Sequence, residues 1–272
     1  MTDTSTPTGR GPITALVAVT YVAMVTMNVL ANALPLNGRN TGDISDAYPS
    51  LFTPAGITFS IWSLIYLLLG LHVLYQLGLF RVGRLDGDQT ALLNRVGLLF
   101  AASSLANTAW IFAWHYDVIP LSVVLIVAIL VCLILIADTI RAAHLTTREK
   151  WFIAVPFSIY FGWTTVATVS NVTVLLVSVG WDGFGISAAA WATVIVVVAM
   201  LIGTATMLRN RDVAYGLVLI WAFSGILLRQ VSPAGLDGRY PTIVAAVVAS
   251  LVIFAAAEVL VLRRRTHGMA SA

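Results

Sequence analysis

Apolar and polar positions separate into long blocks along this chain. Apolar runs of about 20 residues alternate with short polar segments. Eight such runs lie near residues 12–34, 54–80, 91–114, 118–141, 151–178, 186–208, 212–230 and 241–262. Runs of this length cross a bilayer as α-helices, whereas a membrane β-barrel shows alternating segments of about ten residues. The pattern therefore predicts an all-α integral membrane protein with about eight transmembrane helices.

Composition supports this class and narrows the partners. Apolar residues make up 59% of the chain and charged residues 10%, whereas a soluble domain carries roughly 25% charged residues. The net charge is +3, and the basic residues fall at the ends of the runs instead of forming one patch. We therefore expect a lipid bilayer around the chain and no nucleic-acid partner. The single cysteine, Cys132, lies inside an apolar run and gives neither a disulfide framework nor a metal cluster.

Basic residues predict the orientation. With eight spans, twelve of the fifteen lysines and arginines fall on one side: Arg10, Arg81, Arg84, Arg95, Arg141, Arg148, Lys150, Arg209, Arg211, Arg263, Arg264 and Arg265. Only Arg39, Arg229 and Arg239 fall on the other. Cytoplasmic loops carry the excess of positive charge. We therefore expect both termini in the cytoplasm and the chain in the cytoplasmic membrane.

Four polar or aromatic side chains share one depth. Counting at about 1.5 Å per residue places Asn28, Trp62, Asn107 and Asn171 roughly 9 to 12 Å inside the outer boundary. Amides that face lipid are costly, so we expect these side chains to face the interior of the bundle. An asparagine in a membrane helix also serves as a simple bond between helices, and that structural role stays open for each one alone.

Three of these side chains share a helical face with other aromatic or small residues, because residues three, four or seven apart lie on one side of a helix. The face in the second run contains Trp62, Tyr66 and Gly70, and the face in the third run contains Asn107, Trp110 and Trp114. The face in the fifth run contains Trp163, Ala167 and Asn171, with Ser170 beside them. Together they predict an aromatic chamber that opens toward the outer side under the loop from Pro35 to Thr53. Apolar walls with a few polar groups are typical of a small-molecule site. Tryptophans at the span ends, such as Trp114 and Trp151, are interpreted as interfacial anchors.

The predicted spans lack the residues that several kinds of chemistry require. The ionisable candidates within the spans, Asp138 and Glu258, lie near cytoplasmic ends, where snorkelling and pairing with nearby arginines explain them. The only lysine, Lys150, lies at a loop boundary, which excludes a membrane-embedded retinal Schiff base. The histidines are scattered, and no carboxylate pair or activated nucleophile occurs in the spans. Neither a metal site nor a catalytic residue is predicted, and an integral membrane enzyme is the weakest hypothesis.

The three faces carry a family resemblance. The second run reads Pro54, Trp62, Tyr66 and Gly70, the third has Asn107 followed by Trp110, and the fifth reads Trp163, Ala167, Thr168 and Asn171. In this order and spacing they resemble the TspO/MBR family, also called tryptophan-rich sensory proteins or translocator proteins. The resemblance implies a five-helix bundle over residues 12–180 with three additional helices over 181–265, between cytoplasmic tails at 1–11 and 266–272.

The resemblance also implies a ligand. The family binds tetrapyrroles such as protoporphyrin IX inside its bundle, and some members bind sterols. The implied ligand-binding residues here are Trp62, Tyr66, Asn107, Trp110, Trp163, Ala167 and Asn171. The chain departs from the family at Gly56, where an aromatic residue is usual, at Pro156, which is displaced by three residues, and in its last three helices.

Two functions follow as hypotheses. The first is a membrane receptor or binding protein for a flat hydrophobic molecule, a porphyrin or related tetrapyrrole, with indole rings stacked on it and Asn107 and Asn171 bonded to its polar edge. The alternative is a transporter or exporter of a hydrophobic metabolite, with the added helices as the moving part. No cofactor is required in either case, and assembly into a homo-oligomer stays open.

Overall fold

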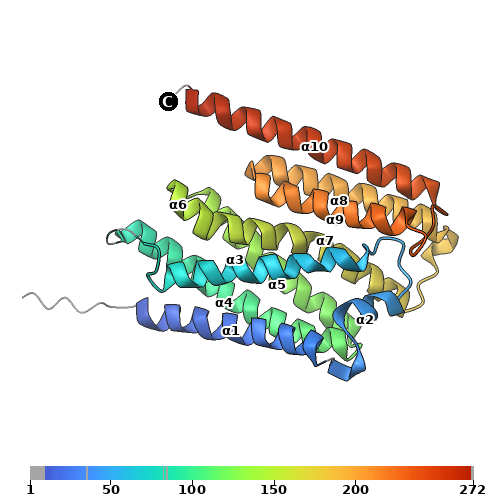
Figure 1. The fold of residues 1–272 in the computed structure, drawn as a ribbon, viewed down its shortest axis with the longest axis horizontal. Helices are drawn as coiled ribbons and strands as arrows, with labels where there is room; N and C mark the ends of the chain where they lie inside the picture. Colours follow the sequence, from blue (N-terminus) through green and yellow to red (C-terminus); the bar gives the residue numbers. More distant parts are fainter. Residues whose placement is uncertain (1–9, 35, 82, 84, 271–272) are drawn as a thin grey trace, which may run out of the picture.

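The computed structural model describes residues 10–34, 36–81, 83 and 85–270, without the side chains of 10 and 265–270. Within these ranges the chain forms helices, turns and loops and no strand. The long helices are α1 (Arg10–Ala33), α3 (Ile61–Gln76), α4 (Gly87–His115), α5 (Ile119–Arg141), α7 (Val155–Ser178), α8 (Ala188–Asn210), α9 (Val213–Val231) and α10 (Pro241–Ala270) (Figure 1). The short ones are η1 (Leu36–Gly38), α2 (Thr41–Ala47), η2 (Gly56–Ser60), α6 (Thr147–Glu149), η3 (Lys150–Ala154) and η4 (Gly183–Gly185).

Eight helical segments of the described chain are long and apolar enough to cross a membrane, which confirms the predicted class and number. The second segment joins η2 to α3, and the fifth joins α6 and η3 to α7. The last helix extends beyond the expected end at residue 262 and continues to Ala270, through most of the expected tail. Residues 1–9 of the other expected tail, and residues 271–272, lie outside the described chain.

Local sequence signals fix several helix starts. Asp86 accepts a hydrogen bond from the Gln89 backbone N–H, 2.7 Å away, and so caps α4. Ser187 caps α8 and Asp212 caps α9 in the same way. These side chains satisfy backbone N–H groups that have no partner within the helix. These three spans therefore begin at a polar residue that marks the start of an apolar run.

Pro156 shapes the start of α7. Proline has no N–H to donate to the carbonyl four residues earlier, which here belongs to Phe152. The preceding turn, η3, widens to a π-helix, and the Phe152 carbonyl lies 2.8 Å from Nδ1 of the buried His72. Because a carbonyl only accepts, the Nδ1 atom carries the proton. This bond joins α3 to α7 near the end of the bundle that contains α6.

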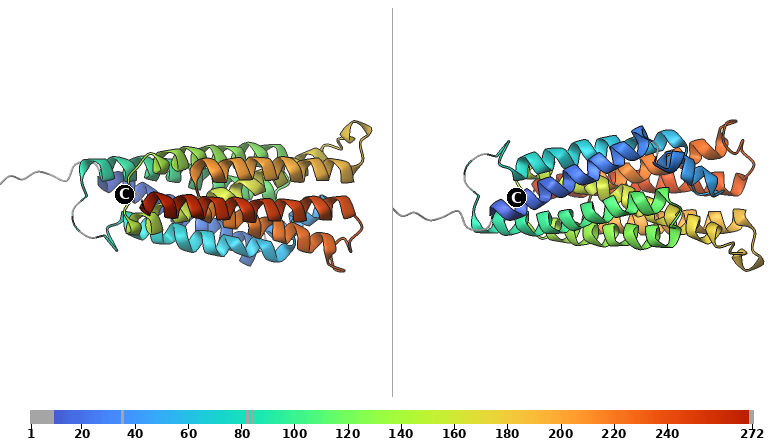
Figure 2. Two further views of the ribbon diagram at one scale, coloured as in Figure 1. Left: turned by 90° about the horizontal axis from the view of Figure 1, so that it is seen from above. Right: turned by 90° about the horizontal axis from the view of Figure 1, so that it is seen from below.

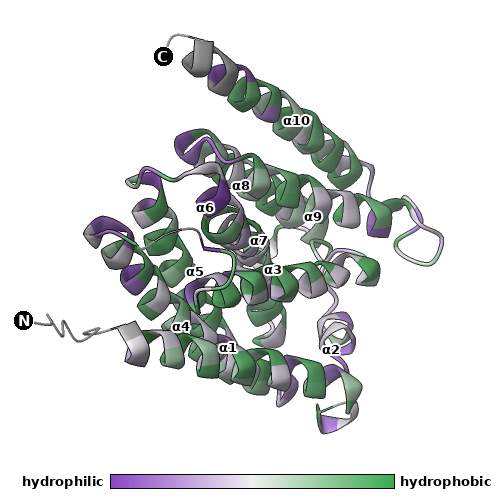
Figure 3. Cartoon of the chain, turned by 60° about the vertical axis from the view of Figure 1, so that its left-hand side comes forward, coloured by the Kyte–Doolittle hydropathy of each residue, from purple (hydrophilic) through white to green (hydrophobic). Residues whose placement is uncertain are grey.

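The helices form two groups. Helices α1, α3, α4, α5 and α7 make one bundle, and α8, α9 and α10 lie together along one side of it (Figures 1 and 2). Helix α9 contacts the bundle through α7 and η2. Apolar side chains such as Val19, Leu201 and Val252 lie exposed along the outside, and Figure 3 shows hydrophobic residues over the length of the helices. This surface suits surrounding lipid.

Charged residues gather at the helix ends. We call the end that contains α6 the basic end and the opposite end, which contains α2, the cover end (Figure 1). Asp138 pairs with Arg141 at 2.9 Å and with Arg209 at 3.1 Å, as expected for a span end. Glu258 differs from expectation, because it is only 6% exposed and faces Gly216 of α9. A glycine at this crossing leaves room for the carboxylate inside the helix group, so it does not snorkel to the surface.

Candidate functional site: an aromatic chamber under a cover segment

Trp62 is the centre of an aromatic cluster in the bundle. Its ring stacks on Tyr66 with centroids 5.5 Å apart and lies 6.5 Å from Trp110. Tyr160 and Trp163 meet it edge-on at 6.1 and 6.2 Å. Such offset and edge-to-face contacts favour aromatic packing beyond simple burial. Residues from α3, α4 and α7 thus converge at one level, as the depth counting predicted.

An amide chain joins three helices beside this cluster. The Nδ2 atom of Asn28 on α1 donates to the Asn107 Oδ1 atom of α4 at 2.8 Å. The Asn107 Nδ2 atom in turn donates to the Tyr160 hydroxyl of α7 at 3.2 Å. All three side chains are buried. The chain satisfies polar groups that would otherwise be costly in an apolar interior.

Asn171 is braced in a similar way. Its Oδ1 atom accepts from the Trp110 indole N–H at 3.0 Å, and its Nδ2 atom donates to the Ser122 hydroxyl of α5 at 2.9 Å. An amide has four hydrogen-bonding positions, two acceptor and two donor. Asn171 therefore orients the Trp110 ring and keeps capacity for a further bond.

A small cavity lies between these rings and the segment above them. Its volume is about 40 Å³. It is lined by Thr41, Ser45, Pro54, Phe59, Trp62, Trp110, Trp114, Trp163, Val166, Ala167, Ser170 and Asn171. Small-molecule pockets typically measure about 300 to 1,000 Å³, so this chamber is too small to hold such a ligand in the present arrangement of its walls.

One polar atom in the wall has no partner. The indole N–H of Trp163 is buried and makes no hydrogen bond with any described residue. The two indole N–H groups from α4 have partners: that of Trp110 donates to Asn171, and that of Trp114 donates to the Thr41 carbonyl at 3.1 Å. A buried donor without a partner costs about 1 to 3 kcal/mol. Trp163 thus lines the cavity and has a buried donor without a hydrogen-bond partner among the described residues.

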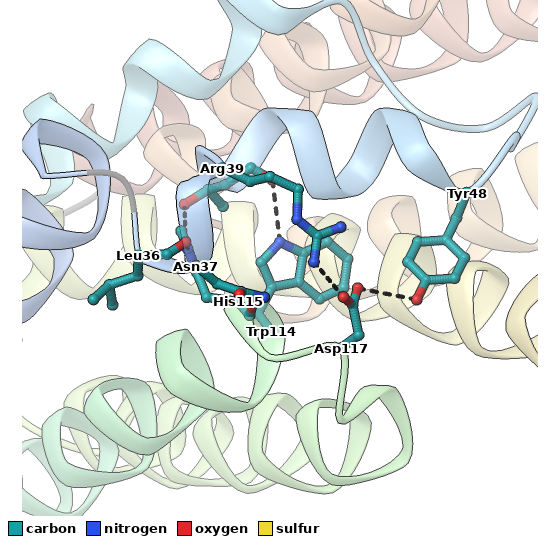
Figure 4. Close-up of polar contacts among 8 residues, drawn as sticks. Leu36, Asn37, Arg39, Tyr48, Trp114, His115 and Asp117 are labelled. Atoms are coloured by element: carbon teal, nitrogen blue, oxygen red, sulfur yellow. Dashed lines mark hydrogen bonds and ion pairs between the residues drawn. The ribbon is translucent and has the colours of Figure 1, made fainter.

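Residues 36–55, here called the cover segment, close the chamber. His115 at the end of α4 holds its start, with Nδ1 3.2 Å from the Leu36 carbonyl and Nε2 3.1 Å from the Thr41 hydroxyl (Figure 4). Because the carbonyl only accepts, a neutral ring donates from Nδ1 and accepts from Thr41. Asn37 donates to the His115 carbonyl at 3.0 Å. Pro35, the first residue of the expected loop, lies outside the described chain.

Asp117 anchors the cover segment from the turn after α4. It forms an ion pair with Arg39 and accepts a hydrogen bond from the Tyr48 hydroxyl at 3.1 Å (Figure 4). Desolvation of the Tyr48 hydroxyl, together with the Asp117 carboxylate, raises the pKa of Tyr48 above its ordinary value. The hydroxyl therefore stays protonated and donates to Asp117 across the ordinary pH range.

Helix α9 holds the other side of the cover segment. Arg229 pairs with Asp46 of α2 at 2.7 Å, and the Gln230 amide donates to the Leu51 carbonyl at 2.7 Å. Further along, the Ala55 N–H donates to the Gly225 carbonyl at 3.0 Å. The additional helices are thus part of the closure of the chamber.

Removing the ion pair to α9 is expected to loosen the cover segment. In Asp46→Asn the Arg229 guanidinium loses its charged partner, and we expect faster amide hydrogen exchange across α2. The thermal unfolding temperature should change little, because exposed ion pairs contribute about 0 to 1 kcal/mol. Hydrogen-exchange mass spectrometry measures this, with Asp182→Asn as a control at the same end, where Asp182 caps η4 instead. Unchanged exchange across α2 would show that Arg229 does not hold the segment.

The structure brings most of the predicted site residues together. Five of the seven line the cavity, namely Trp62, Trp110, Trp163, Ala167 and Asn171. Tyr66 stacks behind Trp62, and Asn107 lies in the amide chain, so neither forms the wall. The role of all seven in binding a ligand stays a prediction.

Other residues of the site were missed or misread. Trp114 is only 5% exposed and lines the cavity, which agrees with its predicted place on the face of Asn107 and Trp110, whereas its interpretation as an interfacial anchor is wrong. Tyr160 lies one turn before Trp163, and helical spacing could have added it to the same face. Phe59 lies three residues before Trp62 within the expected second run, so the same spacing could have added it to that face. No signal marked Thr41, because it lies in the loop between the first two runs.

Comparison with known proteins gives one family match, and it covers most of the chain. A family model described as TSPO-like protein matches residues 14–260. The chain belongs to the TSPO-like protein family. The match extends across all eight spans of this TSPO-like chain, so the last three helices lie within the matched region. No curated protein and no solved structure matches it. Among the residues that the structure describes, no group of three metal-ligating side chains occurs.

Proposed function

We propose that this TSPO-like membrane protein binds a flat hydrophobic molecule, a porphyrin or related tetrapyrrole, in the aromatic chamber. The unpaired indole N–H of Trp163 carries the proposal. It offers a donor to a carboxylate or carbonyl at the edge of the ligand, which relieves the cost of leaving that donor buried without a partner. The surrounding indole rings offer faces for stacking.

Binding requires the chamber to open. A volume of about 40 Å³ holds a few water molecules, each of which needs about 10 to 15 Å³ on this measure. A macrocycle therefore enters only when the cover segment moves away and the rings of Trp62 and Trp163 separate. Closure over the bound ligand would then exclude water. The contacts to Asp117 and Arg229 set the cost of opening.

The asparagines have a supporting part in this proposal. Asn107 is bonded to Asn28 on one side and to Tyr160 on the other and does not line the cavity, so it holds the helices in place. Asn171 retains a free hydrogen-bonding position at the cavity wall. We therefore assign the contact with the polar edge of the ligand to Trp163 first and to Asn171 second.

Tryptophan fluorescence tests the binding site. Titration of the detergent-purified protein with protoporphyrin IX should give saturable quenching. In Trp163→Phe an aromatic ring remains but the N–H donor is lost, and we expect about ten-fold weaker binding, which corresponds to about 1.4 kcal/mol. Trp181→Phe, which removes an indole outside the chamber, should bind like the wild type. Absence of saturation, or equal affinity in Trp163→Phe, would contradict the proposal.

The same preparation distinguishes binding from export. Protein reconstituted into vesicles that contain protoporphyrin IX should retain the pigment if it is a binding protein. Net release of pigment that depends on the protein, and that Trp163→Phe slows, would support the transporter hypothesis instead.

A further inference from the structure

A second and much larger hollow lies at the basic end. Its volume is about 1190 Å³, and it runs between α3, α5, α7 and α9. Figure 3, in which this end is turned forward, shows these helices around α6. The aromatic chamber lies on the other side of α3, since Phe59 and Trp62 line the chamber whereas Ser60 and Ile61 line this hollow. We call it the basic groove.

The deep part of the basic groove is apolar and exposed along its length. Leu64 of α3 and Leu217 and Trp221 of α9 line it, with exposed fractions of 46%, 56% and 42%. From Asp212 to Trp221, helix α9 rises about 14 Å at 1.5 Å per residue. One leaflet of the hydrocarbon core is about 15 Å thick. The groove therefore has the length of a single leaflet.

The mouth of the groove is positively charged. Arg141, Lys150 and Arg211 line it together with one acidic residue, Asp212. The Asp212 carboxylate accepts hydrogen bonds from the Tyr215 backbone N–H and from the Ser158 hydroxyl, so it is occupied with capping α9 and joining it to α7.

A second acidic residue does not cancel this charge. Asp138 is shared between Arg141 and Arg209. Four basic side chains thus stand against two acidic ones around the mouth. The Lys150 residue is exposed, and its side chain makes no hydrogen bond or ion pair with any described residue. The Lys150 ammonium is thus a cationic group at the mouth that no carboxylate of the described residues matches.

We propose that the basic groove binds an anionic phospholipid from the leaflet at the basic end. The headgroup phosphate would lie against Lys150, Arg141 and Arg211, and an acyl chain would follow α9 toward Trp221. Basic pockets between membrane helices suit anionic headgroups in this way, and the apolar wall continues the environment of the acyl chain. This site is separate from the chamber and does not depend on the proposed tetrapyrrole binding.

Native mass spectrometry tests the lipid. The protein is reconstituted in vesicles of phosphatidylcholine with about one fifth phosphatidylglycerol, an anionic lipid, and is then released in mild detergent. Retained lipid should be enriched in phosphatidylglycerol relative to the vesicle. Lys150→Gln should lower that enrichment about five-fold, the ratio for about 1 kcal/mol per basic residue near an anionic surface. Arg95→Gln removes an exposed charge of the same end outside the groove and should have no effect.

A second pair of variants tests the acyl site. Leu217→Trp fills the groove at an exposed position, where the fold tolerates the larger ring, and should reduce retention of both lipids. Leu201→Trp makes the same change on α8, at a residue that is 58% exposed and outside the groove, and should retain lipid like the wild type.

Four outcomes would overturn the proposal. Retained lipid in the ratio of the vesicle would show no selection for the headgroup. Equal retention in Leu217→Trp and Leu201→Trp would place the lipid elsewhere. A dimer mass without lipid, lost in Leu217→Trp, would show that a second copy of the chain covers the groove. If inorganic phosphate alone displaced the lipid, the site would bind only the phosphate group and not the acyl chain, which would also contradict the proposal.

Discussion

Replacing Gly162 with alanine is expected to destabilise the protein, and replacing it with leucine to destabilise it strongly. A Cβ atom at this position would lie 2.9 Å from the Val218 Cβ atom and 3.0 Å from the Tyr215 carbonyl oxygen of α9. A backbone atom cannot move aside as a side chain can, so α9 must shift away from α7. Overpacking of a core costs about 1 to 3 kcal/mol, and the leucine should lie at the upper end.

The position of α9 makes this effect visible beyond stability. A shift of α9 should also weaken its contacts with the cover segment, so α2 should exchange its amide hydrogens faster in Gly162→Leu. Thermal unfolding followed by circular dichroism, together with hydrogen exchange, measures both. Gly87→Ala is the control, because no atom lies within 4 Å of the added methyl group. A normal unfolding temperature in Gly162→Leu would mean that α7 and α9 are not closely packed.

Replacing Asn107 with leucine is the second change with a large expected effect. It removes the acceptor of Asn28 and the donor to Tyr160 while the side chain keeps its branching at Cγ. The Tyr160 oxygen then lies buried without this donor, and we expect a loss of about 2 to 3 kcal/mol. Asn94→Leu changes a partly exposed position of the same helix and should alter stability by less than about 0.5 kcal/mol.

A double-mutant cycle separates this network from simple packing. Asn28→Leu with Asn107→Leu removes both amides of one hydrogen bond, and such paired replacement is close to neutral when the shapes fit. The double variant should therefore be no less stable than Asn107→Leu alone. Strictly additive losses, measured by thermal unfolding, would show that the two amides are not coupled.

The span pattern and the depth of the amides were readable from the sequence for physical reasons. Length and hydropathy decide whether a helix can cross a bilayer, and the eight spans followed directly. Asn28 and Asn107 meet because amides at one depth have few alternatives to each other in an apolar interior. Asp138 pairs with Arg141 because they lie one turn apart on α5.

Contacts between segments that are far apart in the sequence could not be predicted. Gln230 and Leu51 are separated by 179 positions. Nothing in the sequence distinguishes Arg229 from other basic residues at the ends of spans. The volume of the chamber was also hidden, because ring orientations decide it, and spacing fixes only which helical face a ring occupies. The burial of Glu258 depends on Gly216 of another helix, which periodicity within one helix does not reveal.

Helix α9 connects the two ends of the molecule, because Asp212 at its start bonds to Ser158 and Gln230 near its end bonds to the cover segment. If a ligand in the chamber displaces the cover segment and thereby shifts α9, the contact between Ser158 and Asp212 changes as well. Thermodynamic linkage then requires that a molecule whose binding shifts α9 at the Asp212 end changes the affinity for the chamber ligand by the same factor as the chamber ligand changes the affinity for that molecule.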